Sequence, residues 1–156
     1  PGLTASVCNL NPLSKGSVHI KSKDLDIQPE INPNYLSHTT DKKVAADSIK
    51  LARKIISQPG MKKYNPVEYA PGENFQTDDE LEKVAGDIGT TIFHPVGTCA
   101  MGIQNDSVTK PNLKVNGVEK LRVVDASVMP SITSGNTNSP TLMIAEKASE
   151  LILNEV

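Results

Sequence analysis

The chain has 156 residues, with 16 basic and 18 acidic side chains, a formal net charge of −2 and a hydrophobic fraction of 37%. This length and composition are typical of a folded globular protein and exclude a disordered polyampholyte. No apolar run approaches the length of a membrane span, and the scattered basic residues form no patch for nucleic acid. We therefore expect a soluble protein. Its compartment stays open, because the acceptor triplet at 105–107 would carry a glycan only if the protein were secreted.

Two extended segments are predicted near the start of the chain, which begins without a methionine or a leader and so looks trimmed. Residues 17–22 alternate apolar and polar side chains, as a half-exposed strand does. Residues 26–36 contain two prolines, which favour an edge or irregular strand. His19 lies in the first segment and His38 in the polar turn after the second, so both are expected to be solvated bystanders.

Two helices are predicted next. Apolar residues recur with helical spacing after Thr40, the expected N-cap, until the proline and glycine at 59–60 end the helix. Thr77 and Glu80 form a capping box, in which each side chain accepts a hydrogen bond from the backbone amide of the other residue. The short helix that follows this box is expected to end at 86–89.

The last third of the chain is richer in small residues and turns. Residues 91–94 should be extended, and glycines bracket a tight segment at 97–102. A strand is expected at 120–125. A strong amphipathic helix follows, with Pro140 expected near its first position, where the missing N–H of a proline costs nothing.

Two segments of this last third could carry chemistry. His94 precedes a run of small residues that lets a backbone and a flat ligand approach closely, although on local grounds a satisfied core histidine fits equally well. The loop at 136–138 delivers unpaired backbone N–H groups to the start of a helix, which suits an anion or a carbonyl. The local alternative is that Asn136 or Asn138 merely caps its own helix.

Metal chemistry has little support in the sequence. Cys8 and Cys99 lie far apart and belong to no Cys-x-x-Cys pair, so neither a disulfide framework nor a zinc site is expected. A metal hydrolase built on His94 would need a second ligand at a workable spacing, and the chain offers none. No metal is therefore predicted.

Three blocks resemble the C-terminal signature of the glucose-methanol-choline (GMC) flavoprotein oxidoreductases, in family order across nearly the whole chain. Residues 11–18, together with 29–31 and 34–36, are similar to the start of the late strands of the substrate domain. Residues 94–102, HPVGTCAMG, resemble the segment that bears the catalytic histidine. LRVVDASVMP at 121–130, with residues 134–141 and 144–148, resembles the family's closing motif. The sequence is most similar to choline-dehydrogenase-like and aryl-alcohol-oxidase-like members.

The resemblance implies an α+β fold class. Residues 9–104 would be the C-terminal part of the substrate-binding domain, including the histidine segment, and residues 105–156 would return to the FAD-binding α/β domain with a strand and a helix. The family holds the ADP half of FAD on a Gly-x-Gly-x-x-Gly turn, a spacing absent from this chain. The chain thus resembles the C-terminal portion of a larger enzyme, whose N-terminal FAD-binding portion would be its partner, and alone it should bind FAD weakly or not at all.

The resemblance also implies a reaction. A small primary or secondary alcohol would give its hydroxyl proton to His94 and a hydride to flavin N5, while Asn136 holds and orients the substrate oxygen. Phe93 would line the substrate pocket, although a core role fits it as well. This scheme requires His94 and Asn136 to converge on the same face of the flavin ring. The electron acceptor, oxygen or a quinone, stays open.

Four residues are implied as cofactor contacts. Asp125 and Ala126 would pass beside the ribityl and diphosphate linkage of FAD. The backbone of Thr137 and Asn138, at the start of the last helix, would face the flavin near N1 and the C2 carbonyl, where the reduced ring is negative.

Two positions depart from the family pattern. Ala100 stands where many members have arginine, and Asn136 stands where many have a second histidine, yet both variants are compatible with activity. Two alternative functions stay open. A hydroxynitrile lyase on this scaffold would keep FAD and the His94 base without net redox change, and an isolated fragment would have no activity of its own.

Overall fold

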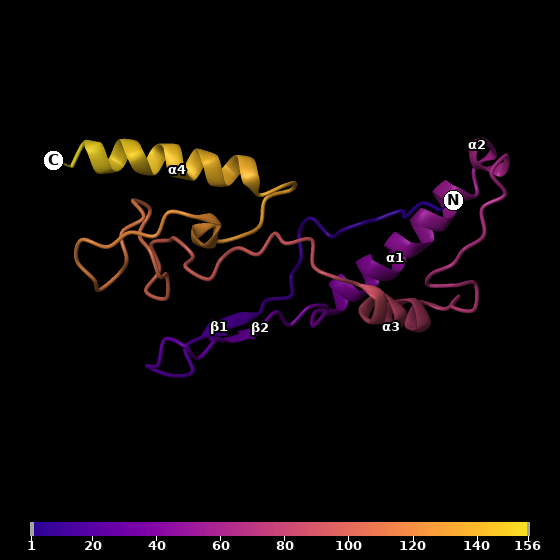
Figure 1. Cartoon of the computed structure of the whole chain (residues 1–156), viewed down its shortest axis with the longest axis horizontal. Helices are drawn as coiled ribbons and strands as arrows, with labels where there is room; N and C mark the ends of the chain where they lie inside the picture. The colour runs from indigo at the N-terminus through magenta and orange to yellow at the C-terminus, as the bar shows by residue number, and fades with distance from the viewer. Residues whose placement is uncertain (1, 156) are drawn as a thin grey trace. The chain divides into compact units, whose positions relative to one another are not determined.

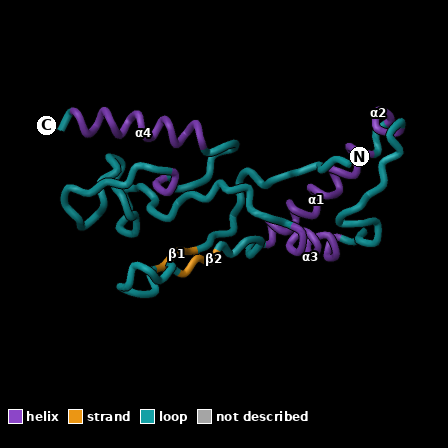
Figure 2. The backbone as a smooth tube through the Cα atoms, in the orientation of Figure 1, coloured by secondary structure: helices purple, strands orange, loops and turns teal. Residues whose placement is uncertain are grey.

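The computed structural model describes residues 2–155, which pack as two compact units. Unit 1 runs to Thr90, and unit 2 starts at Thr91. Each unit has its own hydrophobic core. Figure 1 labels the helices and strands in chain order, and Figure 2 shows that loops make up most of unit 2 outside its one long helix.

The regular structure of unit 1 starts with a short antiparallel hairpin. It consists of β1 (Ser17–His19) and β2 (Glu30–Asn32), which lie within the two predicted extended segments and are shorter than them. Gly16 allows this pairing, because a Cβ atom at that position would collide with the carbonyl oxygen of Asn32. The hairpin therefore depends on a glycine directly before its first strand.

Two helices form the core of unit 1, α1 (Thr39–Ile56) and α3 (Asp78–Ile88). Figure 1 shows α3 lying against α1. Their apolar faces meet, as their helical spacing predicts. The residues buried there are Ala46, Leu81 and Val84, with Ile49 and Phe75 packed against them.

Capping side chains decide where the helices of unit 1 begin. His38 caps α1, since its Nδ1 accepts from the Thr40 amide at 3.1 Å; the predicted cap, Thr40, lies inside the first turn instead. His38 is thus part of the local structure rather than a bystander. The capping box of Thr77 and Glu80 is confirmed, with both reciprocal bonds present. The proline at 59 opens a one-turn helix, α2 (Pro59–Lys62), after α1 has ended.

Asp41, in the first turn of α1, is buried, with only 3% of its surface exposed. Its carboxylate accepts hydrogen bonds from the amides of Leu13 (3.0 Å) and Ser14 (2.6 Å), from the Ser14 hydroxyl (2.5 Å) and from Asn9 Nδ2 (3.0 Å). Burial alone would raise the pKa of Asp41, but the hydrogen bonds from Ser14 and Leu13 outweigh it and hold that pKa below its ordinary value. The N-terminal segment is thereby fastened to α1.

The long helix of unit 2, α4 (Asn138–Leu153), begins before the proline that was expected near its first position. Its N-cap is Thr137, so Pro140 is the third helical residue, where its missing N–H is still harmless. α4 contributes Ile144 and Ala148 to the core of unit 2. The other core members are Leu113, Val128 and Met129, with Val96, Met101, Val123, Val124 and Ala126 packed against them.

The strands expected at 91–94 and 120–125 do not form. In the described part of unit 2, β-type pairing is limited to isolated bridges, one of which joins Lys114 to Arg122. The backbone gives the reason, because Phe93 has a φ of 64° and Lys120 a φ of 58°, values that no strand residue adopts. A one-turn 3₁₀ helix, η1 (Ala126–Val128), follows the second of these segments.

An ion cluster fastens the C-terminal end of α4. Glu155 pairs with Lys114 Nζ at 2.9 Å and with Arg122 Nη2 at 2.5 Å. Hydrogen bonds from Arg122 and then from Lys114 lower the pKa of Glu155 below its ordinary value. Because Leu113 and Val123 lie next to these two cations in the sequence and pack in the core, the cluster ties α4 to that core.

Candidate functional site

His94 lies half-buried in a loop of unit 2, directly after a strained residue. Phe93 has a φ of 64°, which is rare for an aromatic residue, and its side chain is 81% exposed. The Thr91 hydroxyl holds this turn by accepting from the Phe93 amide at 3.0 Å. Strain of this kind clusters at functional sites, where the surrounding structure has to hold it. The turn before His94 is therefore strained, as are five other non-glycine positions of the described chain.

The segment that follows His94 is bonded to η1. The Cys99 amide donates to the Ser127 carbonyl oxygen at 3.0 Å, and the Met101 amide donates to the Val128 carbonyl oxygen at 2.9 Å. These two bonds place residues 97–102 beside the segment that starts at Asp125. Two of the segments selected from the sequence are therefore neighbours in the same unit.

Thr109 holds the same segment from another direction. It is fully buried, and its Oγ1 donates to the Cys99 carbonyl oxygen at 3.0 Å. Its amide donates to the Ala100 carbonyl at 3.3 Å, and its own carbonyl accepts from the Gly102 amide at 3.0 Å. Sequence reasoning missed Thr109, because no motif or periodicity distinguishes it from the other threonines of the chain.

The first pair of predicted cofactor contacts has a clear local structure. Asp125 is exposed and caps η1, because its Oδ1 accepts from the Ser127 amide at 2.8 Å and from the Ser127 hydroxyl. Ala126 packs against the core of unit 2. One carboxylate oxygen of Asp125 is therefore used within the turn, while the side chain as a whole faces solvent.

The second pair lies at the start of α4. Thr137 is 8% exposed, and its side chain makes no capping hydrogen bond. Asn136 and Asn138 are exposed, and neither is the N-cap, so the alternative that one of them caps this helix is wrong. Among residues 2–155, the amides of Thr137 and Asn138 have no acceptor, and the first turn of α4 contains no acidic side chain. This helix end is open to an electron-rich group.

The segments of His94 and Asn136 share one core. Val96, two residues after His94, packs in the same cluster as Ile144 of α4. Within the described residues no hydrogen bond joins the side chains of His94 and Asn136. Their convergence on a single substrate therefore stays a prediction.

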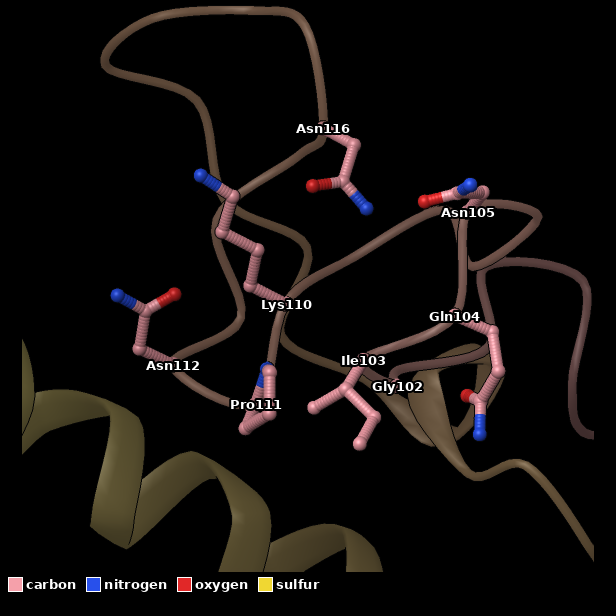
Figure 3. Close-up of a pocket in the computed structure, with 8 residues that line it drawn as sticks. All are labelled: Gly102, Ile103, Gln104, Asn105, Lys110, Pro111, Asn112 and Asn116. Atoms are coloured by element: carbon pink, nitrogen blue, oxygen red, sulfur yellow. The ribbon is translucent and has the colours of Figure 1, made fainter.

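A hollow of about 610 Å³ lies among the loops of unit 2. Figure 3 shows the residues that line it. Neither His94 nor Asn136 lines it. Two of its amide side chains are committed to the loops themselves: Asn112 Oδ1 accepts from the Lys114 amide at 3.3 Å, and Asn116 Nδ2 donates to the Ser107 carbonyl at 2.7 Å. We therefore assign it no chemistry.

Residues 2–155 contain no group of three His, Cys, Asp or Glu side chains placed to hold a metal ion. Over the same span, no helix has both the length and the apolar composition needed to cross a membrane. Cys8 is exposed and Cys99 half-buried, and both are free thiols.

Comparison with protein families matches residues 12–145 to the family described as GMC oxidoreductase, in its C-terminal region. The chain belongs to the GMC oxidoreductase family. The resemblance seen in the histidine segment and the closing motif is thereby confirmed.

Curated proteins similar to this GMC chain are much longer than it. The alcohol dehydrogenase [acceptor] of Pseudomonas putida is 44% identical over 155 residues, which are 99% of this chain and 28% of that protein. The oxygen-dependent choline dehydrogenase of Citrobacter koseri is 44% identical over 151 residues, 97% of this chain and 27% of that protein. The chain spans little more than a quarter of the length of these relatives.

Solved GMC structures confirm the α+β fold class. An FAD-dependent oxidoreductase from Chaetomium thermophilum matches with a TM-score of 0.86 and 33% identity, covering 94% of this chain and 26% of that one. The assignment of residues 9–104 and 105–156 to two domains of a larger GMC enzyme stays a prediction.

Gly97 offers a test of how tightly the GMC histidine segment is held. Its φ is 89°, and a Cβ atom there would lie 3.4 Å from the Met129 carbonyl oxygen. We expect Gly97→Ala to cost about 1–2 kcal/mol of unfolding free energy, because an L-residue is strained at that φ. The thermal unfolding midpoint of the full-length protein measures this. Gly60→Ala is the control, since a Cβ at Gly60 meets no atom within 4 Å; equal midpoints for both variants would contradict the prediction.

Proposed function

We propose that this chain is part of an FAD-dependent oxidoreductase that oxidises a primary or secondary alcohol, with His94 as the base. Family membership and the similarity to an alcohol dehydrogenase and a choline dehydrogenase support this assignment. The observation that carries it is the pair of backbone bonds from Cys99 and Met101 to η1, which joins the histidine segment to the segment proposed to contact the cofactor.

The residues at the start of α4 fit the polar edge of a flavin. The amides of Thr137 and Asn138 point to no acceptor in the described chain, and no acidic side chain competes for them. A helix N-terminus of this kind stabilises a negative group by about 0.3–1 kcal/mol. We infer that these amides hold the flavin near N1 and the C2 carbonyl. Asp125 Oδ1 is used by Ser127, and the carbonyl oxygens of Asp125 and Ala126 accept from the amides of Val128 and Met129. The other carboxylate oxygen of Asp125 and the amides of Asp125 and Ala126 remain for the ribityl and diphosphate side.

When bound, FAD supplies the redox chemistry by accepting a hydride from the carbinol carbon at flavin N5. His94 accepts the hydroxyl proton of the alcohol on its imidazole ring, so the substrate leaves as a carbonyl compound. Asn136 donates its amide N–H to the substrate oxygen and orients it. The exposed ring of Phe93 supplies an apolar wall beside the substrate. The rate gained by these residues comes from holding the alcohol in a reactive geometry.

The partner of this chain in the proposed enzyme is an N-terminal FAD-binding portion. The chain spans about 28% of the length of a similar alcohol dehydrogenase, and it contains no Gly-x-Gly-x-x-Gly turn to hold a diphosphate. We expect that turn elsewhere in the same enzyme.

Anaerobic mixing of the full-length protein with simple primary and secondary alcohols tests the proposed function. We expect the alcohol to reduce the yellow flavin and bleach it. The colour should not return, because no oxygen is present to reoxidise the flavin. A flavin that stays yellow while a cyanohydrin releases cyanide would instead establish a hydroxynitrile lyase. A full-length protein that carries no FAD would refute both readings.

A further inference from the structure

The Cys99 peptide unit is held on both of its sides. Its amide donates to the Ser127 carbonyl oxygen at 3.0 Å, and its carbonyl oxygen accepts from Thr109 Oγ1 at 3.0 Å. Residues 97–102 therefore run between η1 on one side and the segment of Thr109 on the other. The side chain of Thr109 therefore bonds directly to the backbone of the histidine segment, residues 94–102.

The burial of Thr109 makes this bond consequential. The residue is completely inaccessible to solvent, so no water can take the place of the partner of its hydroxyl. A buried polar group that loses its partner costs far more than a hydrogen bond exposed to water. Removal of the Thr109 hydroxyl would consequently loosen the peptide at Cys99.

The connection from Cys99 back to His94 is short. Pro95 fixes its own φ, Val96 is anchored in the core of unit 2, and Gly97 makes the turn. Only four residues separate Cys99 from His94, so a displacement of the Cys99 peptide would also disturb the turn that leads back to His94. A shift of about 1 Å in a reacting group can lower a rate by about 100-fold.

We propose that Thr109 is a positioning residue for His94, which acts by holding the Cys99 carbonyl through its buried hydroxyl. This inference rests on the proposed function, since it concerns the same base. Thr109 itself touches neither substrate nor cofactor in this proposal. Through its bond to the Cys99 carbonyl, its side chain determines the position of the His94 imidazole relative to the alcohol.

The test compares Thr109→Val, which keeps the shape of the side chain without its hydroxyl, with Thr109→Ser, which keeps the hydroxyl. Ser149→Ala is the matched control, because Ser149 Oγ also donates to a backbone carbonyl of unit 2, that of Ala145, but on the exposed face of α4. All variants are made in the full-length protein with FAD bound.

Hydrogen exchange gives a readout that does not depend on activity. In Thr109→Val the amides of residues 97–102 should exchange about 10-fold faster, because one of the bonds that close this segment is gone. Thr109→Ser and Ser149→Ala should retain the original exchange rates there. Unchanged exchange in Thr109→Val overturns the proposal whatever the enzyme catalyses.

Steady-state kinetics distinguishes a loss of positioning of His94 from a general loss of protein stability. At saturating alcohol, Thr109→Val should lower kcat on the order of 10-fold and leave KM within about twofold, and Thr109→Ser should restore most of kcat. Faster exchange with an unchanged kcat also overturns the proposal. If alcohol fails to reduce the flavin of the unaltered protein, the proposed function is wrong. If the unaltered protein is reduced and Thr109→Val has the same kcat, only the role of Thr109 is wrong.

Discussion

Replacing His94 with alanine in the full-length protein is expected to slow the reduction of the flavin by alcohol about 10²–10⁴-fold. The variant loses the group that accepts the hydroxyl proton, so the proton has to leave to water. FAD should remain bound, because the proposed cofactor contacts belong to Asp125, Ala126, Thr137 and Asn138 instead. Anaerobic stopped-flow absorbance gives the rate, and the visible spectrum per protein chain gives the FAD content.

The control is His19→Ala. His19 is an exposed residue of β1 in unit 1 and is assigned no role in the reaction, so this variant should reduce its flavin at the original rate. Reduction at that same rate in His94→Ala would falsify the assignment of His94 as the base. A colourless His94→Ala protein would show that this residue supports the cofactor site rather than proton transfer.

Asp41→Asn is expected to lower the free energy of unfolding by about 2–3 kcal/mol. The substitution keeps the size of the side chain and replaces one carboxylate oxygen with a donor. That donor would face the Ser14 amide, the Ser14 hydroxyl or the Leu13 amide, which are donors themselves. Denaturant unfolding of the full-length protein measures the change. Asp47→Asn is the control, since Asp47 is an exposed member of the same helix and its loss should leave the midpoint unchanged.

The effect of Asp41 should also depend on pH. Its pKa in the folded protein lies below the ordinary value of 3.8, so the unfolded chain takes up the proton more readily. The stabilisation is complete above the ordinary pKa and is lost as the pH falls through the folded-state pKa. The difference between the original protein and Asp41→Asn should therefore shrink below about pH 4. A difference that grows on acidification would contradict the hydrogen-bonding account of Asp41.

Features formed by neighbours in the sequence were predictable. The capping box of Thr77 and Glu80 and the buried stripe of the helix behind it follow from spacings of three and four residues. The strands expected at 91–94 and 120–125 do not form, because a short apolar segment does not reveal a positive φ, which Phe93 and Lys120 adopt. Long runs without regular structure were therefore the least predictable part of the fold.

The candidate site divides in the same way. The histidine segment at 94–102 was predicted from the sequence, because its small residues and its resemblance to a family motif are both visible in the amino-acid sequence alone. The hydrogen bonds that hold this segment in place could not be predicted from the sequence. The partners of Cys99 are Thr109 and Ser127, which come from two later segments of the chain.

The sequence by itself determined the family, the α+β class, the helices α1 and α3 of unit 1 and the identity of the proposed base. Only the tertiary structure decided that His38 caps α1, that Asp41 is a buried acceptor for the N-terminal segment, and that Thr109 holds the peptide after His94. The physical reason is distance along the chain. A bond within one helical turn depends on local spacing, whereas a buried hydroxyl or carboxylate obtains its partner only when packing brings remote segments together.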